Sequence, residues 1–529
     1  MDSHQKIVRS AGVMAFFTLI SRVTGYVRDN LLAQILGAAQ SSDAFIIAFR
    51  IPNLLRRLVG EGALTAAFIP TLSDYARGER RRELWEFVSL AFTTLAVVLA
   101  VITAAGIIFS PLLVKMLAFG FHGIEGKWDL TVSLNRLMFP YIFFIALAAL
   151  AMATLNTLGV FALPAATPIL LNLSIISAAW FFARSAAEPA FVFAWGVLVG
   201  GALQIAVQIP ALWKRGWRPT PRVSFSHPGV VQVGKLMLPG LFGLGISQIM
   251  LVVDSQFASF LGEGAVSALY YAGRVNELAL GSFAISVSTV VLPAMSRHAA
   301  EGRTEELRST LLFGLRIVAF VTIPAMAGLL ALRREVIEVL FERGAFDAAA
   351  TRTTASALLF YAVGLFAFGA IKVIAPAFYA HKDTRTPVIA AAITLGVHIL
   401  LCASLSRFMG LNGIALADSI SAFLNMGLLL AAFRRIHGLT ILRPFVAPAL
   451  IFGAVAAAMG ALCLPVIRFL ASAFHGVALG NVAALFTTLA FGAAFYLGVC
   501  RLLGRDEPGR VLGAMNPFRR KSGAGGAET

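Results

Sequence analysis

The chain has 529 residues, of which 59% are hydrophobic and 13% are charged. An ordinary soluble domain is about 25% charged, and apolar stretches of the roughly 20 residues that cross a bilayer fill almost the whole sequence. We therefore expect an all-α polytopic membrane protein, and the composition excludes a secreted disulfide scaffold, a disordered chain and, despite the net charge of +17, a soluble nucleic-acid binder.

Hydropathy and its charged or Pro/Gly breaks predict about fourteen transmembrane spans. Lys and Arg concentrate in the gaps after even-numbered spans, whereas the gaps after odd-numbered spans hold mostly single basic residues such as Lys127. The positive-inside rule then places both termini in the cytoplasm. The first apolar run has no signal-peptide cleavage site, so we expect it to be a span. The expected spans are 8–36, 43–74, 86–116, 131–156, 164–184, 190–213, 233–261, 266–296, 309–332, 354–380, 386–407, 411–433, 445–469 and 478–503.

The two halves of the chain resemble each other. Residues 29–37 match residues 254–262, and residues 69–73 match residues 292–296 at almost the same offset. The offset covers six spans, so the copies have the same orientation, and two parallel six-helix lobes are a recurrent transporter architecture. We therefore expect two pseudo-symmetric six-helix lobes and two additional helices. The expected parts are an N-lobe at 1–222, a C-lobe at 223–440, spans 13 and 14 at 441–504 and a basic cytoplasmic tail at 505–529.

Ionisable side chains inside spans are informative because each costs about 2.5–3.5 kcal/mol at a helix centre. They concentrate in spans 1, 2, 7 and 8, whereas the interiors of spans 3 to 6 are almost free of charge. Helical spacing places several of them on one face of a span. Such faces cannot point at lipid, so we expect them to line an aqueous cavity between the lobes. The candidate substrate-binding residues are Arg22, Arg28, Asp29, Asp43, Arg56, Arg57, Glu61, Arg274 and Glu277.

Arginine dominates this set, which indicates the chemistry of the substrate. The planar guanidinium group binds phosphate oxygens bidentately, so the set predicts an anionic, phosphorylated substrate. Two other interpretations remain open for single residues: adjacent opposite charges such as Arg28 and Asp29 could be internal ion pairs, and Arg57 could extend its charged end to the membrane interface. Packing alone does not require so many arginines.

No pattern in the chain indicates catalysis. Walker, His-Glu-x-x-His and Gly-x-Ser-x-Gly sequences are absent, and the three cysteines lie in apolar spans without metal-ligand spacing. An intramembrane glycosyltransferase would need a catalytic carboxylate and a large extramembrane loop. A multidrug exporter would need an acidic or aromatic cavity for organic cations. We therefore expect a transporter without a cofactor.

Three segments carry a resemblance to a known family. Residues 21–29, 52–63 and 375–387 resemble the MurJ/MviN family of the MOP exporter superfamily, and the likeness extends over nearly the whole chain. It implies a flippase that moves lipid II, the undecaprenyl-diphosphate-linked peptidoglycan precursor, to the outer leaflet of the bacterial inner membrane by alternating access. It also implies a monomer with lipid II and membrane lipids as partners, and a groove for the lipid tail at spans 13 and 14. The alternative is a multidrug or other polyprenyl-linked saccharide exporter of the same superfamily.

The resemblance also raises the question of the coupling ion. Some members have a sodium site that joins spans 7, 11 and 12, and Asp254 fits its first ligand. His398 and Cys402 occupy positions on span 11 where oxygen donors are expected, although Asp418 on span 12 could compensate. Sodium and a proton both remain open as coupling ions, together with the membrane potential. The chain departs from the family at Gly273, where some members have an acidic residue.

Overall fold

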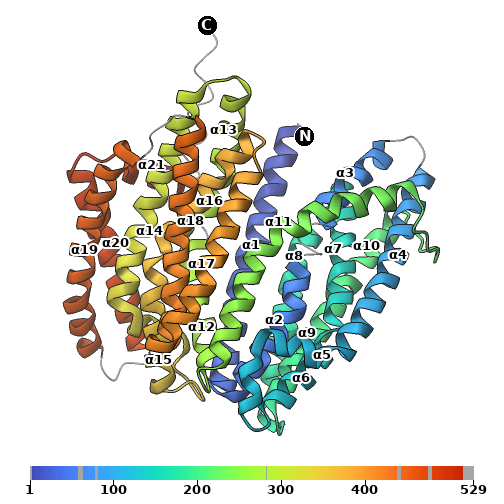
Figure 1. Ribbon diagram of the computed structural model, residues 1–529, viewed down its shortest axis with the longest axis horizontal. Helices are drawn as coiled ribbons and strands as arrows, with labels where there is room; N and C mark the ends of the chain where they lie inside the picture. Colours follow the sequence, from blue (N-terminus) through green and yellow to red (C-terminus); the bar gives the residue numbers. More distant parts are fainter. Residues whose placement is uncertain are drawn as a thin grey trace. The chain divides into compact units, whose positions relative to one another are not determined.

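The computed structural model describes residues 3–57, 64–77, 81–281, 283–437, 442–474 and 479–515. In these ranges all regular secondary structure is helical, and no strand occurs. A backbone that crosses a bilayer must satisfy its own hydrogen bonds, which a helix does within one segment. The apolar runs therefore form long helices throughout the chain (Figure 1), and the expectation of an all-α membrane protein is confirmed.

Every expected span coincides with one helix or with two consecutive helices. Eight spans are single helices: α1 (Ser3–Leu36), α8 (Ala162–Phe182), α11 (Pro228–Ser259), α14 (Thr304–Phe341), α17 (Arg385–Met409), α18 (Leu411–His437), α19 (Leu442–Ala473) and α20 (Gly480–Leu502). Six spans contain two helices: α2 (Gln40–Leu55) and α3 (Leu64–Arg77), α4 (Arg81–Ile108) and α5 (Ser110–Ala118), α6 (Lys127–Met138) and α7 (Tyr141–Thr157), α9 (Pro189–Ala206) and α10 (Ile209–Lys214), α12 (Ala265–Gly281) and α13 (Phe283–Ala300), and α15 (Ala348–Val363) and α16 (Leu365–Ala380). Short 3₁₀ turns, η2 (Phe119–Gly123) and η3 (Ala183–Ser185), and a tail helix, α21 (Glu507–Met515), complete the described chain.

Length and composition separate these helices into two groups. Within the described ranges, nine helical segments are long and apolar enough to cross a membrane, and the bent pair α15–α16 makes a tenth. The expected count of fourteen is consistent with this result. The other four expected spans, 1, 2, 7 and 8, carry most of the ionisable residues, and spans 2 and 8 also include residues outside the described ranges.

A glycine lies at the bend between α15 and α16. The two helices meet at Gly364 with an angle of 42°. A Cβ atom at Gly364 would lie 2.6 Å from the Oγ of Ser419 on α18. That hydroxyl donates a hydrogen bond of 2.5 Å to the carbonyl oxygen of Phe360, the last turn of α15. Glycine therefore permits α18 to approach the bend closely enough for this bond to form.

Packing divides the chain into two compact units. Unit 1 comprises Met1–Ser267 and Phe341–Ala350, and unit 2 comprises Ala268–Leu340 and Thr351–Thr529. In unit 1, α8 packs on α1 and α9, α2 packs on α6, and α11 packs on α3 and α5. In unit 2, α17 packs on α18, α13 packs on α16, and α19 packs on α20. The chain passes between the units within α12, and the expected lobe boundary after residue 222 remains a prediction.

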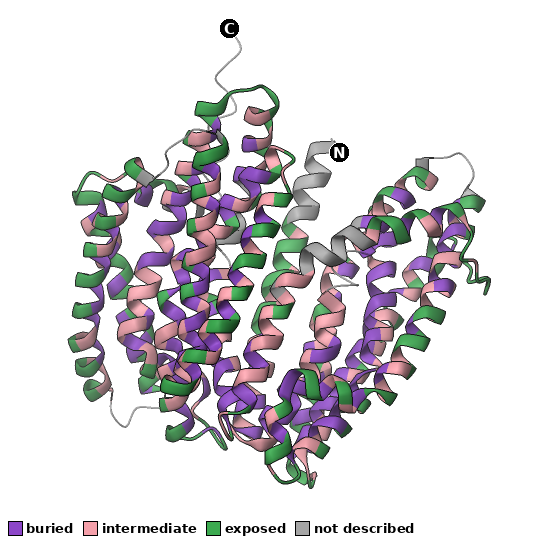
Figure 2. Cartoon of the chain, in the orientation of Figure 1, coloured by how far each residue is buried: buried purple, intermediate pink, exposed green. Residues whose placement is uncertain are grey.

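Burial follows the helix faces (Figure 2). Unit 2 has a core of aliphatic and aromatic side chains from α13, α14, α16 and α18, including Met295, Leu311, Phe378 and Phe433. Large apolar side chains also lie on the outside, and Phe469 on α19 is 70% exposed. Apolar side chains on the outer surface are typical of helices that contact acyl chains.

Candidate functional site

Arg28 on α1 is held by side chains from its own helix and from α8. Its Nε and Nη2 atoms donate hydrogen bonds of 3.0 and 2.7 Å to Oδ1 of Asp29, and Nη1 donates one of 3.0 Å to Oδ1 of Asn172 on α8. The Asn172 amide donates in turn to the carbonyl oxygen of Ser21 and to Oγ1 of Thr24. The Arg28 and Asp29 side chains are only 14% and 4% exposed. Two helices therefore fix the direction of this guanidinium group.

The other candidate residues of α1 differ in burial. Gly25 and Asp29 are buried, whereas Arg22 is exposed. Arg22, Gly25 and Asp29 lie on one face of α1. This face is thus buried where it meets α8 and exposed one turn earlier. A Cβ atom at Gly25 would lie 3.5 Å from the Asn172 amide nitrogen, which is an ordinary contact distance.

The candidate residues Arg56 and Arg57 directly follow α2, which ends at Leu55, and Arg50 lies near the end of the same helix. Arg50 reaches α11, where its Nη1 atom donates to Oγ of the buried Ser255. Arg56 donates a hydrogen bond of 2.8 Å from Nε to Oδ1 of Asn53, and Arg57 next to it is half-buried. The expected site residue Glu61 lies outside the described residues.

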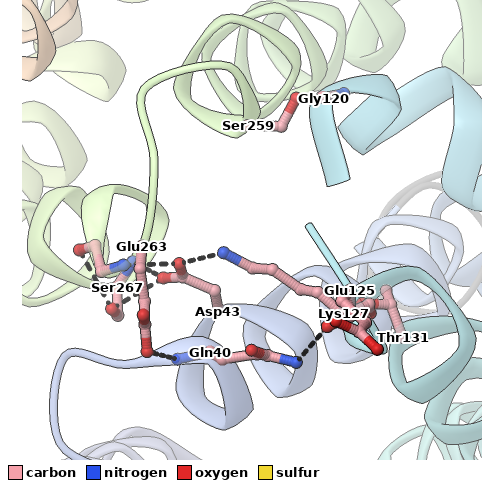
Figure 3. Close-up of polar contacts among 10 residues, drawn as sticks. Gln40, Asp43, Gly120, Glu125, Lys127, Thr131, Ser259, Glu263 and Ser267 are labelled. Carbon is pink, nitrogen blue, oxygen red and sulfur yellow. Dashed lines mark hydrogen bonds and ion pairs between the residues drawn. The ribbon is translucent and has the colours of Figure 1, made fainter. Parts of the chain in front are cut away.

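Asp43, at the beginning of α2, lies in a closed cluster (Figure 3). Its Oδ2 atom accepts hydrogen bonds of 2.8 Å from Nζ of Lys127 and from the backbone N–H of Gly264. Its Oδ1 atom accepts two more of 2.8 Å from the backbone N–H and the hydroxyl of Ser267. The side chains of Asp43 and Lys127 are 0% exposed. Both carboxylate oxygens are therefore occupied by groups of the protein itself.

The candidate pair on α12 is more open. Nη1 of Arg274 lies 2.9 Å from Oε2 of Glu277, as the i, i+3 spacing predicts, and the two side chains are 34% and 60% exposed. The guanidinium carbon also lies 5.9 Å from the ring centroid of Tyr270. At Gly273, where the family resemblance leads us to expect an acidic residue, a Cβ atom would have nothing within 4 Å.

The polar residues of spans 11 and 12 come together within unit 2. The buried His398 on α17 has Nδ1 3.1 Å from Oγ of Ser421 and 3.9 Å from Oδ1 of Asp418, both on α18. Its Nε2 atom lies 3.4 Å from Sγ of Cys402. Asp254, the other expected cation ligand, is buried on α11 in unit 1. The cation site remains a prediction.

Two residues of these clusters were not among the expected site residues. Asn172 is neutral, so a search for ionisable groups in spans does not find it, although an amide in an apolar helix is an available signal. Lys127 served only to orient the membrane topology. Its sequence context in a short gap gives no sign of burial, because the partner Asp43 is distant along the chain.

Comparisons with known proteins show the family of the chain. A protein-family model described as Lipid II flippase MurJ matches residues 32–484. The probable lipid II flippase MurJ of Vibrio cholerae is 40% identical over 440 residues, which cover 82% of this chain and 83% of that protein. The probable lipid II flippase MurJ of Bdellovibrio bacteriovorus is 34% identical over 521 residues, which cover 98% of each.

Solved structures show the same relationship at the level of the fold. The inward closed conformation of a lipid II flippase MurJ matches with a TM-score of 0.75 and 28% identity, over 93% of this chain and 99% of that one. An inward-facing multidrug transporter of the MATE family and MOP superfamily matches with a TM-score of 0.63 and 15% identity, over 82% of this chain and 95% of that one. The second match is a likeness of fold alone. The expected MOP-type fold is therefore confirmed.

Proposed function

Because the chain belongs to the MurJ family of lipid II flippases, we propose that it moves lipid II from the inner to the outer leaflet of the bacterial cytoplasmic membrane for peptidoglycan synthesis. The observation that carries this proposal is the 34% identity to a probable lipid II flippase over 98% of both chains. A match of that extent leaves little of either protein outside the comparison. The protein is a transporter and not an enzyme.

Chemistry of the described arginines supports a diphosphate as the recognised group. Arg28 is held by Asp29 and Asn172, so it loses little side-chain freedom when it binds an anion. Preorganised guanidinium groups bind phosphate oxygens in a planar, bidentate geometry. Arg56 is likewise oriented by Asn53. We assign diphosphate binding to Arg28, Arg56 and Arg274, with Arg22 and Arg57 as further cationic groups.

The exposed pair on α12 offers a way to exchange partners. An exposed ion pair contributes about 0–1 kcal/mol, so a phosphate group can replace Glu277 as the partner of Arg274 at little cost. When the substrate leaves, Glu277 takes back the guanidinium group and prevents permanent capture of the anion. Alternating access then loads the headgroup on the cytoplasmic side and releases it on the other.

The remaining expectations belong to the same proposal. We place both termini in the cytoplasm, on the distribution of Lys and Arg, and treat the working protein as a monomer. Transport is coupled to a cation, sodium or a proton, and to the membrane potential. The groups available to such a cation are Asp254 in unit 1 and, in unit 2, Asp418 with His398 beside it.

Depletion of the protein, followed by measurement of lipid II in each leaflet, tests the proposed function. We expect lipid II to accumulate in the inner leaflet while its synthesis continues. A fall in total lipid II would indicate an enzyme instead, and an unchanged leaflet distribution would indicate an exporter of another substrate.

Single variants test the assigned arginines. Arg28→Ala and Arg274→Ala are expected to abolish complementation of the depleted strain at an unchanged protein level. The matched control is Arg82→Ala, because Arg82 is 89% exposed and pairs only with Glu86 on its own helix among the described contacts. Equal activity of Arg274→Ala and Arg82→Ala would contradict the assignment.

A further inference from the structure

The buried ion pair between Asp43 and Lys127 has no part in the transport site assigned above. Burial of a carboxylate and an ammonium group is strongly unfavourable unless each charge is paired and hydrogen-bonded. Here the carboxylate accepts four hydrogen bonds. Nζ of Lys127 also lies 4.2 Å from the ring centroid of the buried Phe121, an attractive cation–π distance. The cluster is therefore complete only when both charges are present.

Three of the four donors to Asp43 belong to the beginning of α12. They are the backbone N–H of Gly264 and the backbone N–H and hydroxyl of Ser267. The first N–H groups of a helix have no partner within the helix, and a negative charge near them is stabilising. A carboxylate from α2 thus caps α12. About two turns further along the same helix lie Arg274 and Glu277.

Neighbouring contacts hold the same three segments together (Figure 3). The backbone N–H of Gln40 on α2 donates a hydrogen bond of 2.9 Å to Oε1 of Glu263. The side-chain amide of Gln40 donates one of 3.1 Å to the carbonyl oxygen of Glu125. Gly264 has a φ of +79°, and a Cβ atom there would overlap the carbonyl oxygen of Ala38. The start of α2, the segment before α6 and the segment before α12 therefore meet in close backbone contact.

We propose that Lys127 is a positioning residue for the lipid II transport proposed above: by neutralising Asp43, it keeps that carboxylate on the first turn of α12, the helix that carries Arg274. The expected effect on transport rests on the proposed function, whereas the expected effect on the structure of α12 does not. Without the ammonium group, Asp43 is a buried anion with no counter-charge. Its place in the cluster is then no longer favoured, and the cap on α12 weakens.

Accessibility of the first turn of α12 gives a direct test. Ala265 begins α12 and is 4% exposed, and the native cysteines at 402, 463 and 500 are all buried. In an Ala265→Cys background, labelling by a membrane-impermeant thiol reagent in intact cells reports whether residue 265 has become accessible to solvent. We expect Lys127→Met to raise labelling several-fold and to lower lipid II export, with the full-length protein still in the membrane.

A matched control removes a lysine of the neighbouring helix. Lys115 on α5 is exposed and contacts Phe119, so Lys115→Met makes the same chemical change without an uncompensated buried charge. We expect it to leave both labelling and export at the parent level. Parent-level labelling in Lys127→Met, or equal labelling in both variants, would overturn the proposal.

The double variant Asp43→Asn/Lys127→Met separates charge from packing. Removal of both charges leaves an amide oxygen that can still accept from Ser267, so we expect labelling to return toward the parent level. This variant decides the question if Lys127→Met alone does not reach the membrane. Its own absence from the membrane, or labelling as high as in the single variant, would show that Lys127 acts by packing. Labelling involves no lipid II, so failure of lipid II export in the parent would refute the proposed function and not this inference.

Discussion

The ion pairs Asp43–Lys127 and Arg274–Glu277 have almost the same length, 2.8 and 2.9 Å, in very different surroundings. The first is fully enclosed in unit 1, and the second is 34% and 60% exposed in unit 2. Removal of one partner from a buried pair costs about 3–5 kcal/mol, whereas an exposed pair contributes about 0–1 kcal/mol. A charged residue of this chain is therefore fully enclosed and paired in one place and paired but partly exposed in the other.

Arg28 and Asp29 lie between these extremes. Their side chains are 14% and 4% exposed, and Asn172 from another helix completes the cluster. We expect changes here to affect both stability and transport, with a loss of stability between those expected at the two pairs above. Three experiments, from the largest expected effect to the smallest, examine this ordering.

The largest effect is expected for Asp43→Ala. It leaves Lys127 buried without its counter-charge, and we expect the free energy of unfolding to fall by about 3–5 kcal/mol. Thermal or denaturant unfolding of the purified protein in detergent measures the change. Glu277→Ala is the control, with an expected loss of about 0–1 kcal/mol because its pair is exposed. Similar unfolding of the two variants would refute the contrast between the pairs.

An intermediate effect is expected for Asn172→Ala. The change removes the Oδ1 atom that accepts the hydrogen bond from Nη1 of Arg28 in a mostly buried place, and the loss of a buried hydrogen-bond partner costs about 1–3 kcal/mol. We expect a lower unfolding temperature together with reduced lipid II export, smaller than the loss in Arg28→Ala. The control is Asn481→Ala, because the Asn481 amide donates to Glu338 at an exposed position. If both asparagine variants lose equal stability, the buried hydrogen bond to Arg28 contributes no more to stability than the exposed hydrogen bond to Glu338.

The smallest effect is expected for Gly273→Ala beside Arg274. A Cβ atom there meets nothing within 4 Å, so alanine should stabilise the helix by about 0.5–1 kcal/mol without a change in export. Gly369→Ala on α16 is the matched control, since its Cβ would lie 2.7 Å from Cγ1 of Val318 and should destabilise. Loss of export in Gly273→Ala at normal stability would show that this free space is needed by the substrate.

Much of the fold could be predicted from the amino-acid sequence. Within the described ranges the expected spans coincide with helices, because each span must bury apolar side chains and satisfy its own backbone within one segment. The Arg274–Glu277 contact could also be predicted, because i, i+3 neighbours meet on any helix. The grouping of α11 with the first unit was not predicted, since it depends on packing against α3 and α5.

For the candidate site, the sequence by itself determined which helices carry the charges and that arginine predominates among them. Only the tertiary structure decided how each charge is buried and paired. Asp43 was expected in the substrate site and instead has both oxygens bonded within the protein, and Lys127 was expected only to mark topology and instead is its fully buried partner. The physical reason is that hydropathy and helical spacing act between near neighbours in sequence, whereas the burial of a charge depends on segments that meet from distant parts of the chain.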